Sequence, residues 1–346
     1  MKISYPGRLF IINTTFTVVV LIIICTITGC NALEEDFTGG TEWILQVDTD
    51  QAVRSMTFEA RGRLKDLLKE SNVDLSTASL KDEHTIEISG LKPEDETNVK
   101  QILVDNFTGW DFQFSGENAS LTLKQGAVNQ VKEQAILQTV AVMKKRLFAL
   151  GLSENYIQRE TPGSDRLKLR LPPDKHPNRV IGVIRMGGIL EFRSVIDGPF
   201  FAKEEALNTY NGTLPEELNI LQTNPRGREK GFYVVKAYPV IGPRDLEKVR
   251  RSTDQWGGPT VEFTLNPAGA AKFRNYTSKN IGKKLAIVLD NYIESAPVIQ
   301  ATLFDKAVII GNFTIEEAED LARVLNSGGL PAPIKILEEK TIEANE

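Results

Sequence analysis

The strongest constraint on the fold is a long amphipathic helix followed directly by a two-stranded hairpin. In residues 127–150, apolar side chains recur at helical spacing, and Gly151 stands where a left-handed C-terminal cap is expected. Residues 156–160 and 167–171 then form two strand-like runs, joined by a turn of Pro, Gly, Ser and Asp. A helix packed on such a hairpin buries the apolar faces of both. The pattern therefore predicts a two-layer α+β fold.

Short strands and amphipathic helices alternate along the rest of the chain. A strand is predicted at residues 43–48 and a helix at residues 50–70, whose apolar side chains share one face. Further strands are predicted at residues 75–80, 85–88, 112–114, 120–123, 190–196, 232–240, 260–265, 284–290, 308–310 and 334–337. Further helices are predicted at residues 93–106, 266–279 and 314–327. The stretch between residues 197 and 231 is rich in glycine and proline, which predicts a loosely structured excursion.

The N-terminal end carries the pattern of a bacterial lipoprotein signal peptide. Basic residues come first, an apolar run follows, and Gly29 precedes Cys30. We expect residues 1–29 to be removed, Cys30 to be acylated, and residues 30–35 to form a lipid-anchored tether. An uncleaved transmembrane helix is the alternative, since the apolar run is just long enough to span a bilayer. Both place the bulk of the chain in the cell envelope, facing the periplasm or the extracytoplasmic side.

Few residues are candidates for catalysis or metal binding. Once the signal peptide is removed, Cys30 is the only cysteine, so neither a disulfide nor a thiolate metal site is expected. His84 and His176 have no second metal-type ligand at helical spacing. Phosphate-binding and nucleophile-elbow motifs do not occur in the sequence. We therefore expect no cofactor and no metal, and an enzyme is the least favoured class. A formal net charge of −5 without a basic stripe also disfavours binding to nucleic acid.

Three segments carry a family pattern. Residues 36–40, DFTGG, precede the strand WILQVD and are similar to a D-L-[RK]-G-G motif. Residues 144–172 combine a helix end, a turn and a hairpin that ends in Leu-Pro. The longest and most specific segments are residues 280–299 and 311–342. Together they resemble the periplasmic part of the SecD family, accessory subunits of the bacterial Sec protein translocase.

The resemblance assigns family-motif positions to Asp36, Gly39 and Gly40. The two glycines permit a tight turn before the first strand. Thr38 stands where the family has a basic residue, so a contact made by that residue is not expected here. The signal peptide replaces the family's first transmembrane helix. We also expect a chain that ends at Glu346 to lack the family's later membrane helices and their proton-driven pulling.

The resemblance also implies a division into two subdomains. A ferredoxin-like base subdomain would comprise residues 36–187 and 313–342. An α+β head subdomain would be inserted between them at residues 188–312. In this division the helix that begins after Thr314 closes the base.

Two non-catalytic functions follow. The first is a membrane-tethered module that assists protein export by binding unfolded secretory polypeptide on the trans side, with Sec translocase membrane subunits such as SecF or SecY as possible partners. The alternative is a scaffold or assembly lipoprotein of the cell envelope. Phe200, Phe201, Tyr210 and Leu214 are the candidate polypeptide contacts, because apolar side chains on a mobile loop suit a binder of low specificity. The competing interpretation is that they fix the loop to the head.

Overall fold

The computed structural model describes residues 39–343, apart from 74–76, 175 and 228–229. The signal peptide, the tether, Cys30 and Asp36 therefore lie outside the described residues. Within them the chain forms helices and four antiparallel sheets, so the predicted α+β class is confirmed. None of the described helices is both long and apolar enough to cross a bilayer.

Every predicted helix corresponds to one in the structure, although several boundaries move. The helices are α2 (Thr49–Glu70), α3 (Glu96–Asn106), α4 (Gln125–Ala149), α5 (Pro177–Arg185), α6 (Lys203–Thr209), α7 (Pro267–Lys279) and α8 (Ile315–Ser327), with a short 3-10 turn η1 (Pro243–Asp245). Helix α3 was expected to begin at Pro93, which is wrong: Pro93 lies in the turn that precedes it. Helix α7 begins as predicted, with the Asn266 side chain accepting from the backbone N–H of Gly269 at 2.9 Å.

The strands are distributed among the four sheets in an order that differs from their order along the chain. They are β1 (Gly40–Val47), β2 (Thr77–Leu80), β3 (Thr85–Ser89), β4 (Trp110–Ser115), β5 (Asn118–Leu123), β6 (Tyr156–Arg159), β7 (Arg166–Leu171), β8 (Leu190–Phe200), β9 (Leu218–Gln222), β10 (Phe232–Lys236), β11 (Leu246–Thr253), β12 (Pro259–Leu265), β13 (Leu285–Leu289), β14 (Tyr292–Ser295), β15 (Lys306–Ile309) and β16 (Ile334–Ile342).

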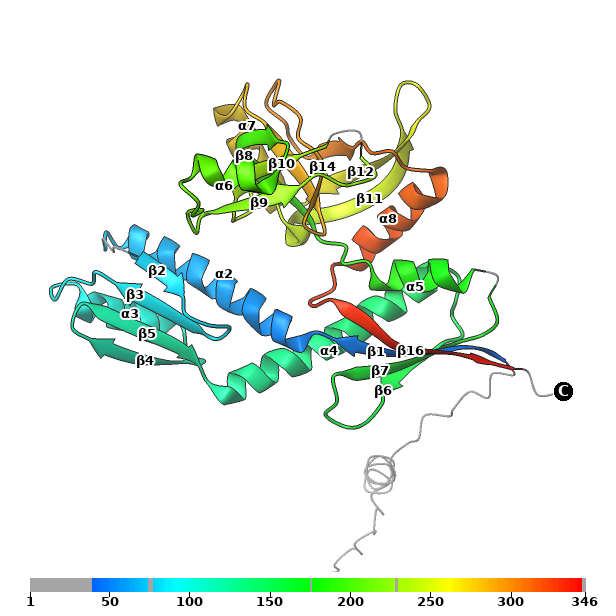
Figure 1. Ribbon diagram of the computed structural model, residues 1–346, viewed down its shortest axis with the longest axis horizontal. Coiled ribbons are helices and arrows are strands. Elements are labelled where there is room, and N and C mark those ends of the chain that lie inside the picture. Colours follow the sequence, from blue (N-terminus) through cyan, green and yellow to red (C-terminus); the bar gives the residue numbers. More distant parts are fainter. Residues whose placement is uncertain (1–38, 74–76, 175, 228–229, 344–346) are drawn as a thin grey trace, which may run out of the picture.

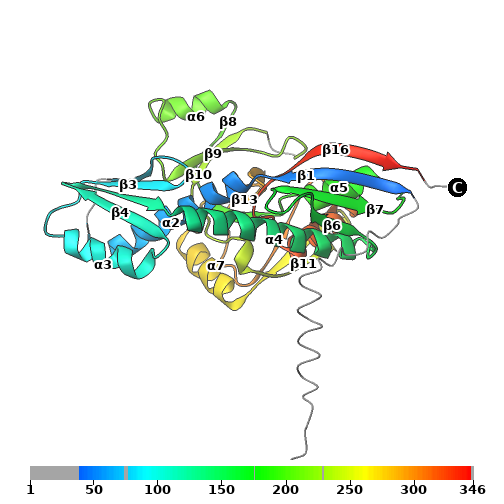
Figure 2. The ribbon, with the colours of Figure 1, turned by 90° about the horizontal axis from the view of Figure 1, so that it is seen from below.

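The first sheet has the ferredoxin-like strand order. Its strands run β16-β1-β7-β6, so the first strand lies between the last and the third. β1 and β16 pair from Gly40 opposite Ile342 to Val47 opposite Ile334, which brings the two ends of the described chain side by side (Figure 1). Helices α4 and α5 cover one face of this sheet (Figures 1 and 2).

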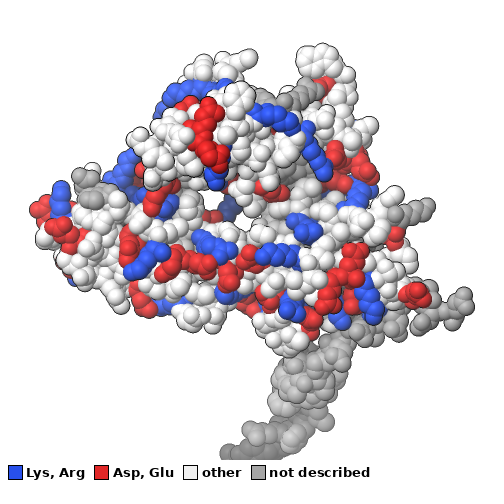
Figure 3. Space-filling view, in the orientation of Figure 1, with Lys and Arg blue, Asp and Glu red and all other residues white. Residues whose placement is uncertain are grey.

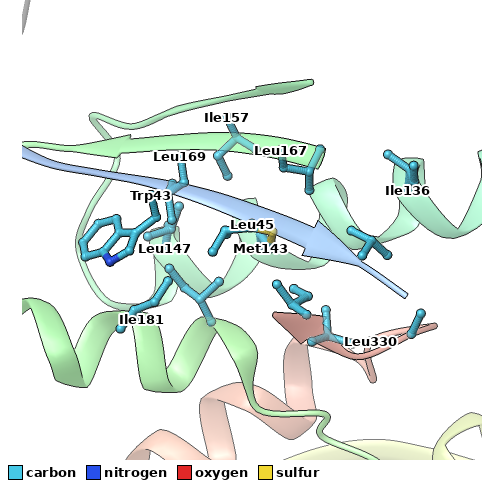
Figure 4. Close-up of a cluster of buried hydrophobic side chains, with 14 of the residues drawn as sticks. Trp43, Leu45, Ile136, Met143, Leu147, Ile157, Leu167, Leu169, Ile181 and Leu330 are labelled. Carbon is cyan, nitrogen blue, oxygen red and sulfur yellow. The ribbon is translucent and has the colours of Figure 1, made fainter. Parts of the chain in front are cut away.

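A single apolar cluster joins this sheet to its helices. Alternation along β1 turns Trp43 and Leu45 inward, and helical spacing brings Met143 and Leu147 of α4 to meet them (Figure 4). Leu169 of β7 completes the contact. Each such side chain is buried, and burial of one side chain of this size contributes about 1.5–3 kcal/mol. The predicted pairing of helix and hairpin is therefore the core of this layer.

A second sheet lies at the far end of the long helices. Its order is β2-β3-β5-β4, and its inner face packs on α2 and α3 around a separate apolar cluster. The strands were predicted from the sequence, but their assembly into a sheet with its own core was not. Helices α2 and α4 run from the first sheet to the second and pack against each other (Figure 1).

The other two sheets lie above these layers, and we call the part of the molecule that contains them the head (Figure 1). One is a five-stranded sheet of order β14-β13-β8-β10-β9, which curls so that Thr223, just after β9, bridges to Ile293 of β14. The other is a three-stranded sheet of order β11-β12-β15. The β13–β14 hairpin turns at Asp290 and Asn291, whose φ values of 49° and 68° suit a type I′ turn.

Helix α8 differs from its expected place in the base. It begins with the predicted capping box, in which Thr314 and Glu317 exchange hydrogen bonds of 2.9 and 3.1 Å. However, its buried side chains, among them Leu321 and Leu325, belong to the apolar cluster of the head sheets, and the helix packs on β11 and β12. It also contacts α4 and α5. The element from the C-terminal part of the chain that completes the first sheet is therefore strand β16. The overall division into base and head stays a prediction.

Candidate functional site

The candidate polypeptide contacts surround α6 on the head. Phe200, Tyr210 and Leu214 are partly buried and pack against a small apolar cluster beneath α6. Phe201 differs, because its side chain is 94% exposed. Three of the four predicted residues thus pack partly against the head, Phe201 is the most exposed of the four, and their role as polypeptide contacts stays a prediction. The expected loose excursion was wrong in this respect: β8, α6 and β9 give the segment regular structure.

The family-motif glycines have a local structural role. Gly39 and Gly40 have φ values of 89° and 121°, which favour glycine. A Cβ atom on Gly40 would lie 2.1 Å from the carbonyl oxygen of Leu171. These glycines therefore allow β1 to begin close beside the end of β7.

Two chain segments connect the head with the layers below it, and they touch. They are residues 186–189 and 327–331, and the backbone N–H of Leu330 donates to the carbonyl oxygen of Gly187 at 2.8 Å. The β13–β14 turn closes over the first segment, where Asp290 accepts from the backbone N–H groups of Gly188 at 3.2 Å and Ile189 at 2.9 Å. The crossing is therefore a compact joint.

A buried arginine of α4 holds both segments of this joint. Arg146 is fully buried. Its guanidinium donates to the Ser327 hydroxyl at 3.0 Å and to the carbonyl oxygens of Gly328 at 3.0 Å, Gly187 at 3.3 Å and Ile184 at 2.8 Å. The planar fork has enough donors to serve all of these oxygens at once. One side chain thus fastens the ends of α5 and α8 to α4.

The charge state of this arginine follows from its surroundings. Burial lowers the pKa of Arg146 to about 10, and the negative charge of Asp290 opposes that shift. The guanidinium is therefore still protonated at neutral pH. Because its hydrogen bonds go to uncharged oxygens, it acts as a structural clamp.

A second contact ties the head to α2. Arg61 is 4% exposed and donates to Glu216 at 2.9 Å and to the Tyr238 hydroxyl at 3.3 Å. The Tyr238 ring stacks on Phe58, with ring centroids 5.1 Å apart. The ring also lies directly over Gly62, where a Cβ atom would be 2.6 Å from it. We call these five residues the α2–head contact.

Within residues 39–343 and outside the stated gaps, no group of three or more His, Cys, Asp or Glu residues is placed to hold a metal ion. Glu294 is buried, and desolvation raises its pKa, while a hydrogen bond of 2.8 Å from Asn224 opposes the shift. Charges of both signs are intermixed over the face seen in Figure 3, where no single-sign stripe stands out.

Sequence patterns did not predict the joint or the α2–head contact. Arg146 follows Lys144 and Lys145, both exposed, and so reads as part of a basic surface run. Arg61 falls outside the apolar stripe of its helix and likewise reads as a surface residue. The one usable signal was that Arg146 lies three residues after Met143, on the apolar face of α4.

Comparisons with known proteins give the family. Residues 219–332 match the model of the SecDF P1 head subdomain, a range that includes α8. Protein translocase subunit SecD of Koribacter versatilis is 32% identical over 315 residues, which cover 89% of this chain and 58% of that protein. This chain is similar to SecD along most of its own length. The same subunit of Aquifex aeolicus is 33% identical over 307 residues, covering 89% of this chain and 59% of that protein.

A solved structure agrees on the fold. The crystal structure of SecDF in its super-membrane-facing form has a TM-score of 0.51 at 23% identity, covering 94% of this chain and 34% of that one. The predicted resemblance to the SecD periplasmic domain is thus confirmed. The chain spans less than two thirds of the length of the curated SecD relatives that it matches.

Proposed function

We propose that this chain is a non-catalytic accessory module of protein export that holds unfolded polypeptide on the trans side of the membrane. The observation that carries the proposal is the similarity to translocase subunit SecD over 89% of the chain. Binding alone biases a translocating polypeptide against sliding back, so this mechanism asks for no cofactor.

The head is the part that we expect to bind. Large apolar side chains stand exposed on it at Phe201 (94%), Trp256 (81%) and Phe304 (61%). Each of these side chains offers apolar surface that a partner could cover. Apolar segments are buried in folded proteins and accessible in unfolded ones, so such groups suit an unfolded client.

The binding step is tested directly with the full chain in detergent. We expect a permanently reduced, alkylated and fluorescently labelled polypeptide to bind weakly and with little dependence on its sequence, as measured by anisotropy. The same protein in its folded, oxidised form is the control and should not bind. Absence of binding by both forms would contradict the proposal and favour a scaffold role in the cell envelope.

We further propose that the module is tethered through a lipid on Cys30. The motivation is the signal-peptide pattern that ends at this cysteine. The variant Cys30→Ser should lose labelling by radioactive palmitate and remain unprocessed in cells. If this variant is still cleaved after Gly29 and labelled, the tether is wrong.

The partners that we propose are membrane subunits of the Sec translocase, such as SecF or SecY. The support is that the similar curated proteins are named as translocase subunits. Mild detergent extraction followed by pull-down on the full chain should recover such subunits. Their absence under conditions that preserve the translocase would argue for a module that works on its own.

A further inference from the structure

The head sheets protect most of their edges. On β11, the side chain of Asn326 from α8 accepts from the backbone N–H of Val249 at 2.9 Å and donates to its carbonyl oxygen at 2.6 Å. On β14, the carbonyl oxygen of Ile293 accepts from the backbone N–H of Asn224 at 2.8 Å. Unpaired strand edges can pair with other chains, so natural proteins commonly cover them.

The edge formed by β15 is different. β15 pairs with β12 on one side and is the last strand of its sheet. The carbonyl oxygen of Asp305 accepts from the backbone N–H of Leu265, so alternate residues from Asp305 onward turn their peptide groups toward β12. Lys306, Val308 and Ile310 therefore turn theirs outward. Among the described residues, none forms a hydrogen bond with these outward groups.

The side chains along this edge are also open and largely apolar. Val308 is 40% exposed, on the sheet face that points away from the core, and Ile310, just after the strand, is 49% exposed. Phe304, just before the strand, is 61% exposed. The charges that guard many natural edge strands are present here as Lys306 and, just before the strand, as Asp305.

We propose that the free edge of β15 takes an extended polypeptide segment as an additional strand, with apolar side chains placed beside Val308 and Ile310. The inference rests on the proposed function and names its place and mode of binding. Main-chain hydrogen bonds are the same for every sequence, so strand addition gives the sequence tolerance that an unfolded client requires.

The occupant is a polypeptide of the client rather than a second copy of this chain. β15 has four residues, and pairing two such short edges would bury far less than the roughly 1,200 Å² typical of a stable interface. Within β15 the one charged side chain is Lys306, which lies on the same face as Val308 because side chains alternate along a strand. A segment that places apolar residues beside Val308 and a neutral or acidic residue beside Lys306 fits this edge.

The first test uses peptides and the unmodified full chain in detergent. The probe is a labelled ten-residue peptide in which valine alternates with threonine and glutamate. Its partner is the same peptide, N-methylated at two adjacent central residues, which blocks both edges of the strand because successive N–H groups point to opposite sides. We expect methylation to weaken binding at least about tenfold. Equal affinity for the two peptides would overturn strand addition.

The second test uses variants of the edge. Val308→Pro removes an outward N–H that β12 does not use, and proline is tolerated on edge strands. It should weaken binding about tenfold, whereas Val308→Thr, which keeps the N–H, should weaken it only about two- to threefold. Ile281→Thr, at an exposed turn elsewhere on the head, is the matched control and should leave the peptide affinity unchanged.

The outcomes separate this inference from the proposed function. If the unmodified chain binds unfolded polypeptide but Val308→Pro binds it equally well, strand addition on β15 is wrong and the export role stands. If the unmodified chain binds no polypeptide, both strand addition on β15 and the proposed polypeptide-binding function are wrong. Circular dichroism and thermal melting check that each variant is folded. If Val308→Pro does not fold, the comparison of the two peptides decides whether strand addition occurs.

Discussion

Arg146 illustrates how a single buried cation can organise a joint. Its donors reach oxygens on residues that follow α5 and α8, and also an oxygen within each helix. A helix C-terminus leaves carbonyl groups without partners, and here a side chain from α4 supplies them. The head and the layers below are thus fastened where the chain crosses between them.

Loss of this side chain should be costly. In Arg146→Met the apolar stem is retained, but several buried carbonyl oxygens lose their donor, each worth about 1–3 kcal/mol. We expect the free energy of unfolding to fall by about 3 kcal/mol or more in urea titrations. Lys145→Met, an exposed neighbour on the same helix, should change it by less than about 0.5 kcal/mol. Similar effects of the two substitutions would contradict the assigned role.

Glu294 predicts a pH dependence of stability in the head. Burial raises its pKa above the ordinary value of 4.5, with the charge of Asp290 adding to the shift. The folded state therefore keeps this proton to higher pH than the unfolded chain does, so the free energy of unfolding falls as pH rises from about 4.5 through the raised pKa. The stabilising contribution of the protonated carboxyl is present below that window and lost above it.

Replacing the Glu294 carboxylate by a neutral amide should remove the free-energy cost of burying its charge. We expect Glu294→Gln to raise the melting temperature at pH 7 by about 2–4 °C and to leave it unchanged at pH 4, as followed by differential scanning fluorimetry. Glu117→Gln, on an exposed turn, serves as the control and should behave like the unmodified protein at both values. A gain for Glu294→Gln that is equal at the two pH values would point to packing rather than charge.

At the scale of elements, the α2–head contact depends on a glycine within a helix. Gly62 costs α2 stability as a helix, yet its missing side chain lets the Tyr238 ring lie against the backbone. In α5, Gly182 is also inside a helix but has open space around the position of a Cβ. The two glycines therefore make a matched pair for measuring the contact.

The pair gives a sharp prediction. Gly182→Ala should stabilise the protein by about 0.5–1 kcal/mol, since alanine is the better helix former. Gly62→Ala should lack this gain or destabilise, because its methyl group displaces Tyr238. In the background of Tyr238→Ala, Gly62→Ala should recover the gain. Urea unfolding of the four variants measures the coupling, and equal gains at both glycines in the original background would refute the close contact.

The sequence predicted most elements but not α5, α6, β9 and β11, and it predicted their assembly less well. The capping box of Thr314 and Glu317, the turn at Asp290 and the hairpin after Gly151 are encoded within a few residues, and all are present. The burial of α8 in the head depends on β11 and β12, which lie some sixty residues earlier. Periodicity shows that a helix has an apolar face but does not say which sheet covers it.

The candidate binding residues show the same limit. The apolar character of Phe200, Tyr210 and Leu214 was visible in the sequence, but their packing beneath α6 required the fold. The free edge of β15 was equally out of reach, because strand order within a sheet decides which strand is outermost. Sequence patterns identify strands, and tertiary pairing identifies edges.

At the scale of the whole molecule, strand β16 closes the first sheet from the far end of the chain. Truncation after Ala332 removes β16 and takes Ile334 and Ile336 from the apolar cluster beneath the sheet. We expect faster hydrogen exchange in α4, which shares that cluster, and unchanged exchange in β11 and β12, which belong to the head core. Truncation after Ile342 is the control. Unchanged exchange in α4 after loss of β16 would refute this dependence.

The pairing of Gly40 with Ile342 has a mechanical consequence. A load applied between the two ends of the described chain pulls on neighbouring residues of antiparallel strands, so it opens the β1–β16 ladder one pair at a time from that end. We therefore expect the seam between β1 and β16 to separate first under such a load, before the head or the second sheet is pulled apart.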